Sequence, residues 1–192
     1  MILYSKYGPK LSVLLDQGIV SGFNFLLGVV LVRQYGAELF GQFSIVLIFV
    51  QGLVAINQAL VTAPLQTLYS KLSSRAYLSK VEGFQIIFLL FVGSTLSILY
   101  GFAELIFPLA FDLSLLGFLV YFLGCVLFDF NRKILFIEEK YQLCLLKDFL
   151  NVFCQVVAFF VFKDVCQGVT GVLFVLGSAC VLLEICFFVL LR

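Results

Sequence analysis

The chain has no histidine and few charged residues. Of its 192 residues 12% are charged, whereas soluble domains carry about 25%. Without histidine the chain lacks a common general base and zinc ligand. It also has no Asp-rich motif, and the adjacent Glu138 and Glu139 would point in different directions on a helix. These absences argue against an enzyme.

The chain also lacks a basic patch and a cysteine motif. Its net charge is +1, and the basic residues are spread along the chain, so we expect no nucleic-acid partner. The six cysteines have no Cys-x-x-Cys spacing and mostly lie in apolar runs. We therefore expect them to pack as small apolar side chains, with no bound metal and no cofactor.

What the chain has is apolar sequence. Hydrophobic residues make up 63% of it, and its mean hydropathy is +1.17. Only lipid is a solvent that matches this composition, and each apolar run is close to the ~20 residues that cross hydrocarbon as a helix. The sequence therefore predicts an all-α transmembrane protein, a single six-span domain over 1–192. The expected spans lie near 12–32, 43–69, 84–103, 113–130, 143–162 and 169–191.

The first run resembles a signal peptide at its start, because Lys6 and Lys10 precede it. It continues to about Val32, however, and no small-residue cleavage site follows. We expect it to be the first span.

Basic residues in the connections predict the orientation. The N-terminus, the 70–83 loop, the 131–142 loop with the start of span five, and the C-terminus hold ten of the twelve. By the positive-inside rule both termini lie in the cytoplasm and the protein is a multi-pass protein of the cytoplasmic (inner) membrane. No connection is long enough for a soluble catalytic domain. The ten are Lys6, Lys10, Lys71, Arg75, Lys80, Arg132, Lys133, Lys140, Lys147 and Arg192; the opposite side has Arg33 and Lys163.

Two spans carry polar residues at helical spacing. A polar stripe facing lipid is costly, so each stripe should face other helices or a water-filled cavity. Either the side chains only form hydrogen bonds between helices, or they line a path for a polar substrate. The first stripe is Gln17, Ser21, Asn24 and Gly28, and the second is Ser44, Gln51, Gln58 and Thr62.

Asp16 and Glu184 are the carboxylates deepest in apolar sequence. Counted from the helix ends, both lie at a similar depth in the cytoplasmic half and could be neighbours. Intramembrane carboxylates often mark ion or proton sites, so both are candidates for ion coupling. The alternative is that they reach the interface or bond to neighbouring helices.

Further polar residues occur near the cytoplasmic ends of spans four and five. Lys147 could contact an anionic headgroup or be an interfacial lysine. Asp129 and Arg132 are three residues apart, a spacing that predicts a local ion pair. In span two, Pro64 should kink or end the helix, and a kink there could act as a hinge.

Three segments carry a resemblance to a known family. They are DQGIVSGFNFLLGVVLVRQYGAELFGQFSIVLIF from Asp16, QALVTAPLQTLYSK around Pro64, and FDFNRKILFIEEKYQLCLLKDFLN from Phe128. The chain resembles the polysaccharide and O-antigen exporters, lipid-linked oligosaccharide flippases of the multidrug/oligosaccharidyl-lipid/polysaccharide (MOP) superfamily. The matching positions are Gln17, Ser21, Asn24, Phe25, Arg33, Gly36, Phe40, Gly41, Asp129, Arg132 and Asp148, whereas Glu138 and Glu139 replace a more basic stretch.

The resemblance implies the N-terminal six-helix lobe of a MATE-like flippase, which would need a second lobe or a second copy to complete its cavity. It implies transport of an undecaprenyl-type lipid-linked oligosaccharide, a polysaccharide precursor, across the membrane, with Arg33 and Lys147 contacting the diphosphate. The residues expected to line the path are Gln17, Ser21, Asn24, Gln51 and Gln58. The alternative is a non-transporting membrane subunit, or a truncated remnant of such an exporter.

Overall fold

The computed structural model describes residues 2–72, 75–106, 114–164, 166 and 168–190. Within these residues every regular element is a helix and there is no strand. Five helical segments among them are long and apolar enough to cross a membrane, which confirms the prediction of a multi-pass helical membrane protein. The helices are α1 (Ile2–Asn57), the π-helix η1 (Gln58–Thr62), α2 (Ala63–Leu72), α3 (Arg75–Ile106), α4 (Leu115–Ile137), α5 (Tyr141–Val161) and α6 (Val169–Leu190).

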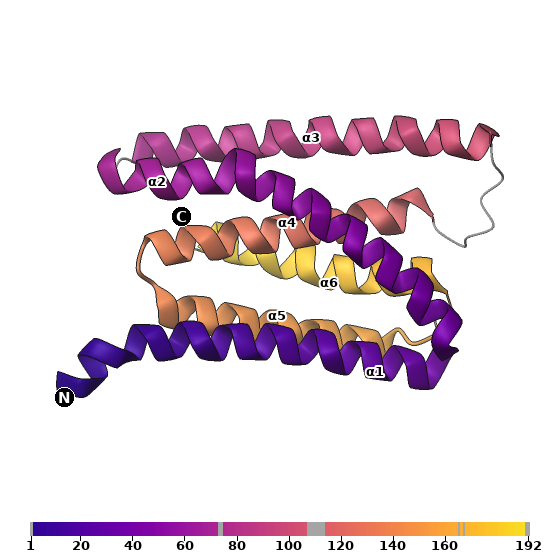
Figure 1. The fold of residues 1–192 in the computed structure, drawn as a ribbon, viewed down its shortest axis with the longest axis horizontal. Coiled ribbons are helices and arrows are strands. Elements are labelled where there is room, and N and C mark those ends of the chain that lie inside the picture. The colour runs from indigo at the N-terminus through magenta and orange to yellow at the C-terminus, as the bar shows by residue number, and fades with distance from the viewer. Residues whose placement is uncertain (1, 73–74, 107–113, 165, 167, 191–192) are drawn as a thin grey trace.

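Helix α1 consists of two arms that meet at Gly36. This residue has φ 87° and ψ 170°, a conformation open to glycine because it has no Cβ. The chain reverses its direction there, as Figure 1 shows. The apolar segment Ser12–Tyr69 has 58 residues, and a straight helix of that length would span roughly 87 Å, far more than the ~30 Å of hydrocarbon. The predicted break between residues 32 and 43 is present as this turn.

Pro64 does not end its helix, and the helix changes direction where α1 passes through η1 into α2 (Figure 1). The preceding turn widens into η1, in which the N–H of Ala63 donates to the carbonyl oxygen of Gln58. A π-turn of this kind redistributes backbone hydrogen bonds around a proline, which has no N–H of its own. The helix then continues as α2, so the expected discontinuity at Pro64 appears as a local widening.

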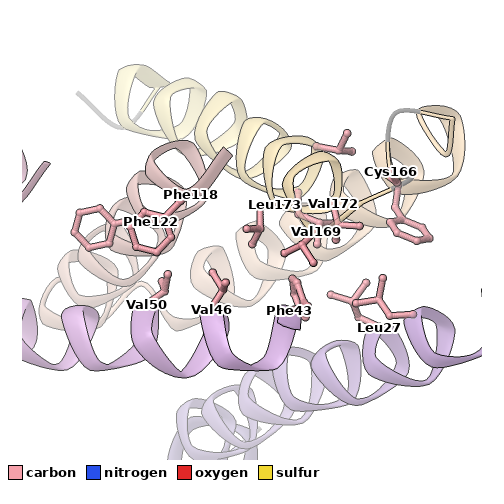
Figure 2. Close-up of a cluster of buried hydrophobic side chains, with 14 of the residues drawn as sticks. Leu27, Phe43, Val46, Val50, Phe118, Phe122, Cys166, Val169, Val172 and Leu173 are labelled. Atoms are coloured by element: carbon pink, nitrogen blue, oxygen red, sulfur yellow. The ribbon is translucent and has the colours of Figure 1, made fainter. Parts of the chain in front are cut away.

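The hydrophobic core joins the second arm of α1 to α4 and α6. Phe43, Val46 and Val50 of α1 point toward Phe118 of α4 and Val172 of α6 (Figure 2). Cys166, in the α5–α6 connection, is fully buried at the edge of this core, and burial raises the pKa of its thiol. It packs as the small apolar residue that the sequence predicts.

Helices α4 and α6 are the most closely packed pair of the described helices. A Cβ on Gly177 of α6 would lie 2.6 Å from the backbone of Tyr121, and one on Gly117 of α4 would lie 2.9 Å from the carbonyl oxygen of Thr170. The Cys180 thiol donates to the carbonyl oxygen of Gly124 across the same interface, at 3.4 Å. Small residues let the two backbones approach, which is how helices associate in lipid.

The outer surface is apolar, as a surface in contact with acyl chains should be. On α3 the side chains of Ile87, Leu90 and Phe91 are 63%, 69% and 69% exposed. This helix lies along the edge of the bundle beside α2 (Figure 1). An exposed face of this kind would be an aggregation liability in water but is ordinary in lipid.

The helix that contains the expected fourth span does not end near residue 130. Helix α4 continues to Ile137, and Asn131 is buried. Charges interrupt the apolar run there and predict a boundary, but Asp129, Asn131 and Arg132 have partners inside the bundle and the helix continues past them. Residues 112, 113, 191 and 192, which carry two predicted span ends and two of the charges, lie outside the described residues.

The chain reverses repeatedly between two ends of the bundle. The beginning of α1, the end of α6 and the short α4–α5 turn lie at one end in Figure 1, and the turn between the two arms of α1 and the α5–α6 connection lie at the other. This arrangement brings several basic connections to one end. The number of spans and the side on which the termini lie stay predictions.

Candidate functional site

Five charged side chains from four helices form a buried ionic cluster. Each member except Arg132 is at most 1% exposed. Buried charges require opposite charges and hydrogen bonds to offset their lost hydration. The ionic cluster consists of Asp16 of α1, Arg132 of α4, Lys147 and Asp148 of α5, and Glu184 of α6.

Arg132 forms one half of the ionic cluster. Its Nη2 atom pairs with Oδ2 of Asp16, and its Nε atom lies 3.3 Å from Oδ2 of Asp148. The guanidinium also lies over the ring of Phe136, 5.3 Å from the centroid. One guanidinium thus connects α1, α4 and α5, which suits its planar array of donors.

Lys147 forms the other half. Its Nζ atom lies 3.1 Å from Oδ1 of Asp148 and 2.9 Å from Oε1 of Glu184, and it sits 4.2 Å from the centroid of the Phe128 ring. The expected interfacial lysine is therefore wrong. In this conformation Lys147 has no exposed surface with which to contact a lipid headgroup.

Amide side chains complete the surroundings of Glu184. Asn131 donates to Oε2 at 2.8 Å, and Asn151 donates to Oε1 at 2.9 Å. Glu184 therefore accepts hydrogen bonds on both oxygens in addition to its ion pair. The Oδ1 atom of Asp16, in contrast, is buried with no hydrogen-bond partner in the described part of the chain.

The ionic cluster contains three carboxylates and two cations. With every member ionised its net charge is −1, so one proton or monovalent cation would balance it. Asp16, Asp148 and Cys144 bring ligand atoms within 4.8 Å of one another and are the residues that could hold such an ion. Because Arg132 already pairs with both aspartates, binding a proton requires less rearrangement than binding a metal ion.

A polar cavity lies beside the ionic cluster. Its volume is about 270 Å³, and it is bounded by both arms of α1 together with η1, α4, α5 and α6. Amides from three helices line it, along with Arg132 and the rings of Phe23, Tyr121 and Phe128. The five amides are those of Asn24, Gln51, Gln58, Asn151 and Gln155.

The wall of the polar cavity is partly organised by hydrogen bonds. Gln58 donates to Oδ1 of Asp129 at 2.9 Å, and Gln155 donates to Oδ1 of Asn151. The local ion pair predicted between Asp129 and Arg132 is replaced by these contacts, because Arg132 turns toward Asp16 and Asp148. Gln51 is exposed and forms no hydrogen bond with the other described residues, so its amide is available to a ligand.

The predicted path residues are placed in different surroundings. Asn24, Gln51 and Gln58 come together in the polar cavity. Gln17 and Ser21 are exposed and are absent from its lining. Arg33 is exposed and lines a separate groove of about 530 Å³ between the two arms of α1.

The hydroxyl groups of the second stripe bond within their own helix. Ser44 donates to the carbonyl oxygen of Phe40 at 2.8 Å, and Thr62 donates to that of Gln58 at 3.3 Å. Such bonds satisfy a hydroxyl without a neighbouring helix. The two longer side chains of the stripe, Gln51 and Gln58, instead extend into the cavity.

Several site residues were not predicted in their observed roles. The sequence predicts a loop position and a local ion pair for Arg132 and no role for Asn131, because both follow a long apolar run. Asp16 and Glu184 are not in direct contact; Arg132, Asp148 and Lys147 connect them. The signal available was the shared face of Asp148, Asn151 and Gln155 on α5, which placed polar groups inward at this depth.

Comparison of the chain with protein-family models found no match, and comparisons with the curated proteins and with the solved structures found none either.

Proposed function

We propose that this chain is one lobe of a membrane transporter that moves a lipid-linked oligosaccharide across the cytoplasmic membrane. The observation that carries the proposal is the polar cavity, which is lined by amides within an otherwise apolar bundle. Amides offer donors and acceptors to sugar hydroxyls, and a few such groups fix the orientation of a ligand. The order of the resembling segments along the chain supports the substrate class.

Transport requires a second wall. Alternating access moves one helical bundle against another around a central site, so a single lobe must pair with a second lobe or a second copy. In this proposal the six spans, counted as the two arms of α1 with its continuation to α2 and then α3 to α6, form a MATE-like lobe with both termini in the cytoplasm. Gln17 and Ser21, exposed in the lone chain, would meet the partner lobe or the substrate.

The ionic cluster is the proposed site at which proton uptake is coupled to transport. Its excess carboxylate favours uptake of a proton by Asp16 or Asp148, because Oδ1 of Asp16 and both carboxylate oxygens of Asp148 are buried without a hydrogen-bond partner among the described residues. Protonation would weaken the contact with Arg132 and free that guanidinium, which also lines the polar cavity. Glu184, with both oxygens occupied, then acts as the fixed partner of Lys147.

Arg132 is also the proposed contact for the diphosphate. A guanidinium binds phosphate oxygens in a bidentate manner, and Arg132 reaches the cavity, whereas Lys147 is fully buried. Arg33 would contact the phosphate only in a state in which the substrate lies near the outer groove.

Replacing the cavity amides tests the proposal. The chain is co-expressed with the partner lobe in a strain that lacks its lipid-linked oligosaccharide flippase. Asn24→Leu and Gln51→Leu should each lower export on the order of tenfold, because each removes a hydrogen-bonding group worth about 1–1.5 kcal/mol. Accumulation of the precursor on the inner leaflet is the measurement. Insertion into the membrane should stay intact, and Phe91→Leu on the exposed face of α3 is the matched control.

The alternative is a membrane subunit that binds a partner and transports nothing. It predicts that the chain copurifies with its partner as well after Asn24→Leu and Gln51→Leu as before, and that export by the complex is unchanged. Unchanged export would reject the transport proposal.

A further inference from the structure

An asparagine interrupts the buried apolar stripe that runs along the second arm of α1 into η1. Val50, Val54 and Val61 recur on one face of the helix and are at most 6% exposed. Asn57 lies on the same face, three residues after Val54, and is 0% exposed. Neither end of its amide has a hydrogen-bond partner among the described residues. A buried amide in this state raises the free energy of the fold, because it has lost its hydration without replacing it.

Helix α3, which contacts η1, carries a second amide in the same state. Gln85 is 2% exposed, and neither its oxygen nor its nitrogen has a partner in the described part of the chain. It lies three residues before Phe88, a buried side chain of the same apolar cluster as Val61. Buried polar groups in folded proteins are rarely left in this state.

Asn57 also separates two apolar clusters. The larger one, part of which Figure 2 shows, includes side chains of α1 up to Val54 and joins them to α4 and α6. The smaller one begins at Val61 and joins η1 and α2 to α3 and to Phe130 of α4. Only partly buried side chains of α3 reach the larger cluster. The α2–α3 pair, at the edge of the bundle in Figure 1, thus has a small apolar cluster of its own.

The backbone between the two clusters is weak. The carbonyl oxygen of Gln58 accepts from the N–H of Ala63 and, at 3.3 Å, from the hydroxyl of Thr62. Pro64 follows and has no N–H, so this turn has fewer backbone hydrogen bonds with which to resist bending.

The side chain of Gln58 connects this turn to the rest of the bundle. Its Nε2 atom donates to Oδ1 of Asp129 on α4 at 2.9 Å, and both residues line the polar cavity. A ligand of the polar cavity that binds either side chain would compete with this hydrogen bond.

We infer that η1 is a hinge, and that the Gln58–Asp129 hydrogen bond holds the α2–α3 pair in the position seen in this structure. In a second position the pair tilts at η1, and the amides of Asn57 and Gln85 gain hydrogen bonds. Because those amides raise the free energy of the first position, the second one is accessible. The hinge does not depend on which ligand the polar cavity binds.

Hydrogen–deuterium exchange of the full chain in lipid nanodiscs tests the hinge, because tilting at η1 breaks the backbone hydrogen bonds of that turn. Gln58→Leu should speed exchange over η1 and α2 on the order of tenfold, since it removes the hydrogen bond to Asp129. Gln155→Leu is the matched control: this glutamine also lines the polar cavity, but it donates to Asn151 of its own helix and should leave η1 and α2 unchanged.

Replacing the two unpaired amides should have the opposite effect. Asn57→Leu combined with Gln85→Met substitutes apolar side chains of similar shape. It should slow exchange over η1 and α2 on the order of tenfold, because the position seen here then buries no unpaired amide at these two sites. Asn131→Leu is the contrast, since it removes a buried amide that is hydrogen-bonded to Glu184 and should not slow exchange.

Two results would overturn the inference. One is unchanged or slower exchange over η1 and α2 in Gln58→Leu, and the other is unchanged or faster exchange in the Asn57→Leu, Gln85→Met variant. If α5 and α6 also exchange faster in Gln58→Leu, that variant is unfolded and the double variant decides alone. Since backbone exchange is measured and not export, loss of the hinge would leave the proposed function standing.

Discussion

At the scale of single residues, the ionic cluster combines a stabilising role with an unbalanced charge. Lys147 and Glu184 are both 0% exposed and lie 2.9 Å apart. Removing one partner of such a pair leaves the other charge buried, without hydration and without a counterion. This typically lowers the free energy of unfolding by about 3–5 kcal/mol, whereas removing both charges lowers it much less. The pair should therefore be strongly coupled.

A double-mutant cycle tests this coupling. Lys147→Met should lower the free energy of unfolding in detergent by about 3–5 kcal/mol. Lys147→Met with Glu184→Gln should restore part of it, because Gln carries no charge and its one amide oxygen still accepts from Asn131 or Asn151. Unfolding followed by circular dichroism measures the effect. Lys140→Met is the control, because the Lys140 side chain is 48% exposed in its pair with Glu138 and its loss should cost about 1 kcal/mol or less. A double variant as unstable as the sum of its single variants would contradict the coupling.

The sequence predicts part of the site at this scale. Helical spacing places Asn24 with Gln17 and Ser21 on one stripe, yet only Asn24 reaches the polar cavity. Spacing locates the face of a helix but not which stretch of that face another helix covers. The partners of Arg132 are 116 and 16 residues away in the chain, so no local pattern could identify both.

At the scale of helices, glycine has two opposite uses. Gly36 permits the reversal within α1, and Gly117, Gly124 and Gly177 permit the close contact between α4 and α6. The break between the apolar runs 12–32 and 43–69 predicts the turn at which the first use occurs. The sequence does not predict the second use, since it depends on the helix that lies opposite.

Substitution of Gly177 tests the helix contact. The Cβ of Gly177→Ala would lie 2.6 Å from the backbone of Tyr121, where no side chain can move aside. We expect a loss of about 1–3 kcal/mol of unfolding free energy, as for overpacked cores. Gly93→Ala is the control, because its Cβ meets nothing within 4 Å. Equal stability of the two variants in a thermal or denaturant unfolding series would show that α4 and α6 are not packed this closely.

Hydropathy predicts some of the helix boundaries and misses others. The end of α5 at Val161 and the start of α6 at Val169 agree with the predicted runs to within a residue. The end of α4 does not, because hydropathy treats a charge as a boundary even when the bundle supplies it with a partner.

At the scale of the whole molecule, the helices reverse between two ends of the bundle. The α4–α5 turn lies at the end where α1 begins, and the α5–α6 connection lies at the other (Figure 1). The distribution of basic residues predicts that the first of these ends faces the cytoplasm.

Cysteine labelling in intact cells tests this orientation. Asp164→Cys, in the exposed α5–α6 connection, should react with a membrane-impermeant maleimide added outside, because it faces away from the cytoplasm. Lys140→Cys, in the exposed α4–α5 turn, should react only after the cells are opened. Labelling is measured as the gain over the parent chain, whose own cysteines are the background. The reverse pattern would contradict the orientation.

The central claim is that an apolar, lipid-facing bundle contains a polar cavity. The most direct measurement is the reaction rate of an introduced thiol with a charged, water-soluble reagent in open membrane vesicles. Because only a hydrated thiol ionises and reacts, Gln51→Cys should react on the order of tenfold faster than Phe91→Cys on the exposed face of α3. Equally slow reaction at both positions would mean that Gln51 faces lipid or protein and that no polar cavity is present.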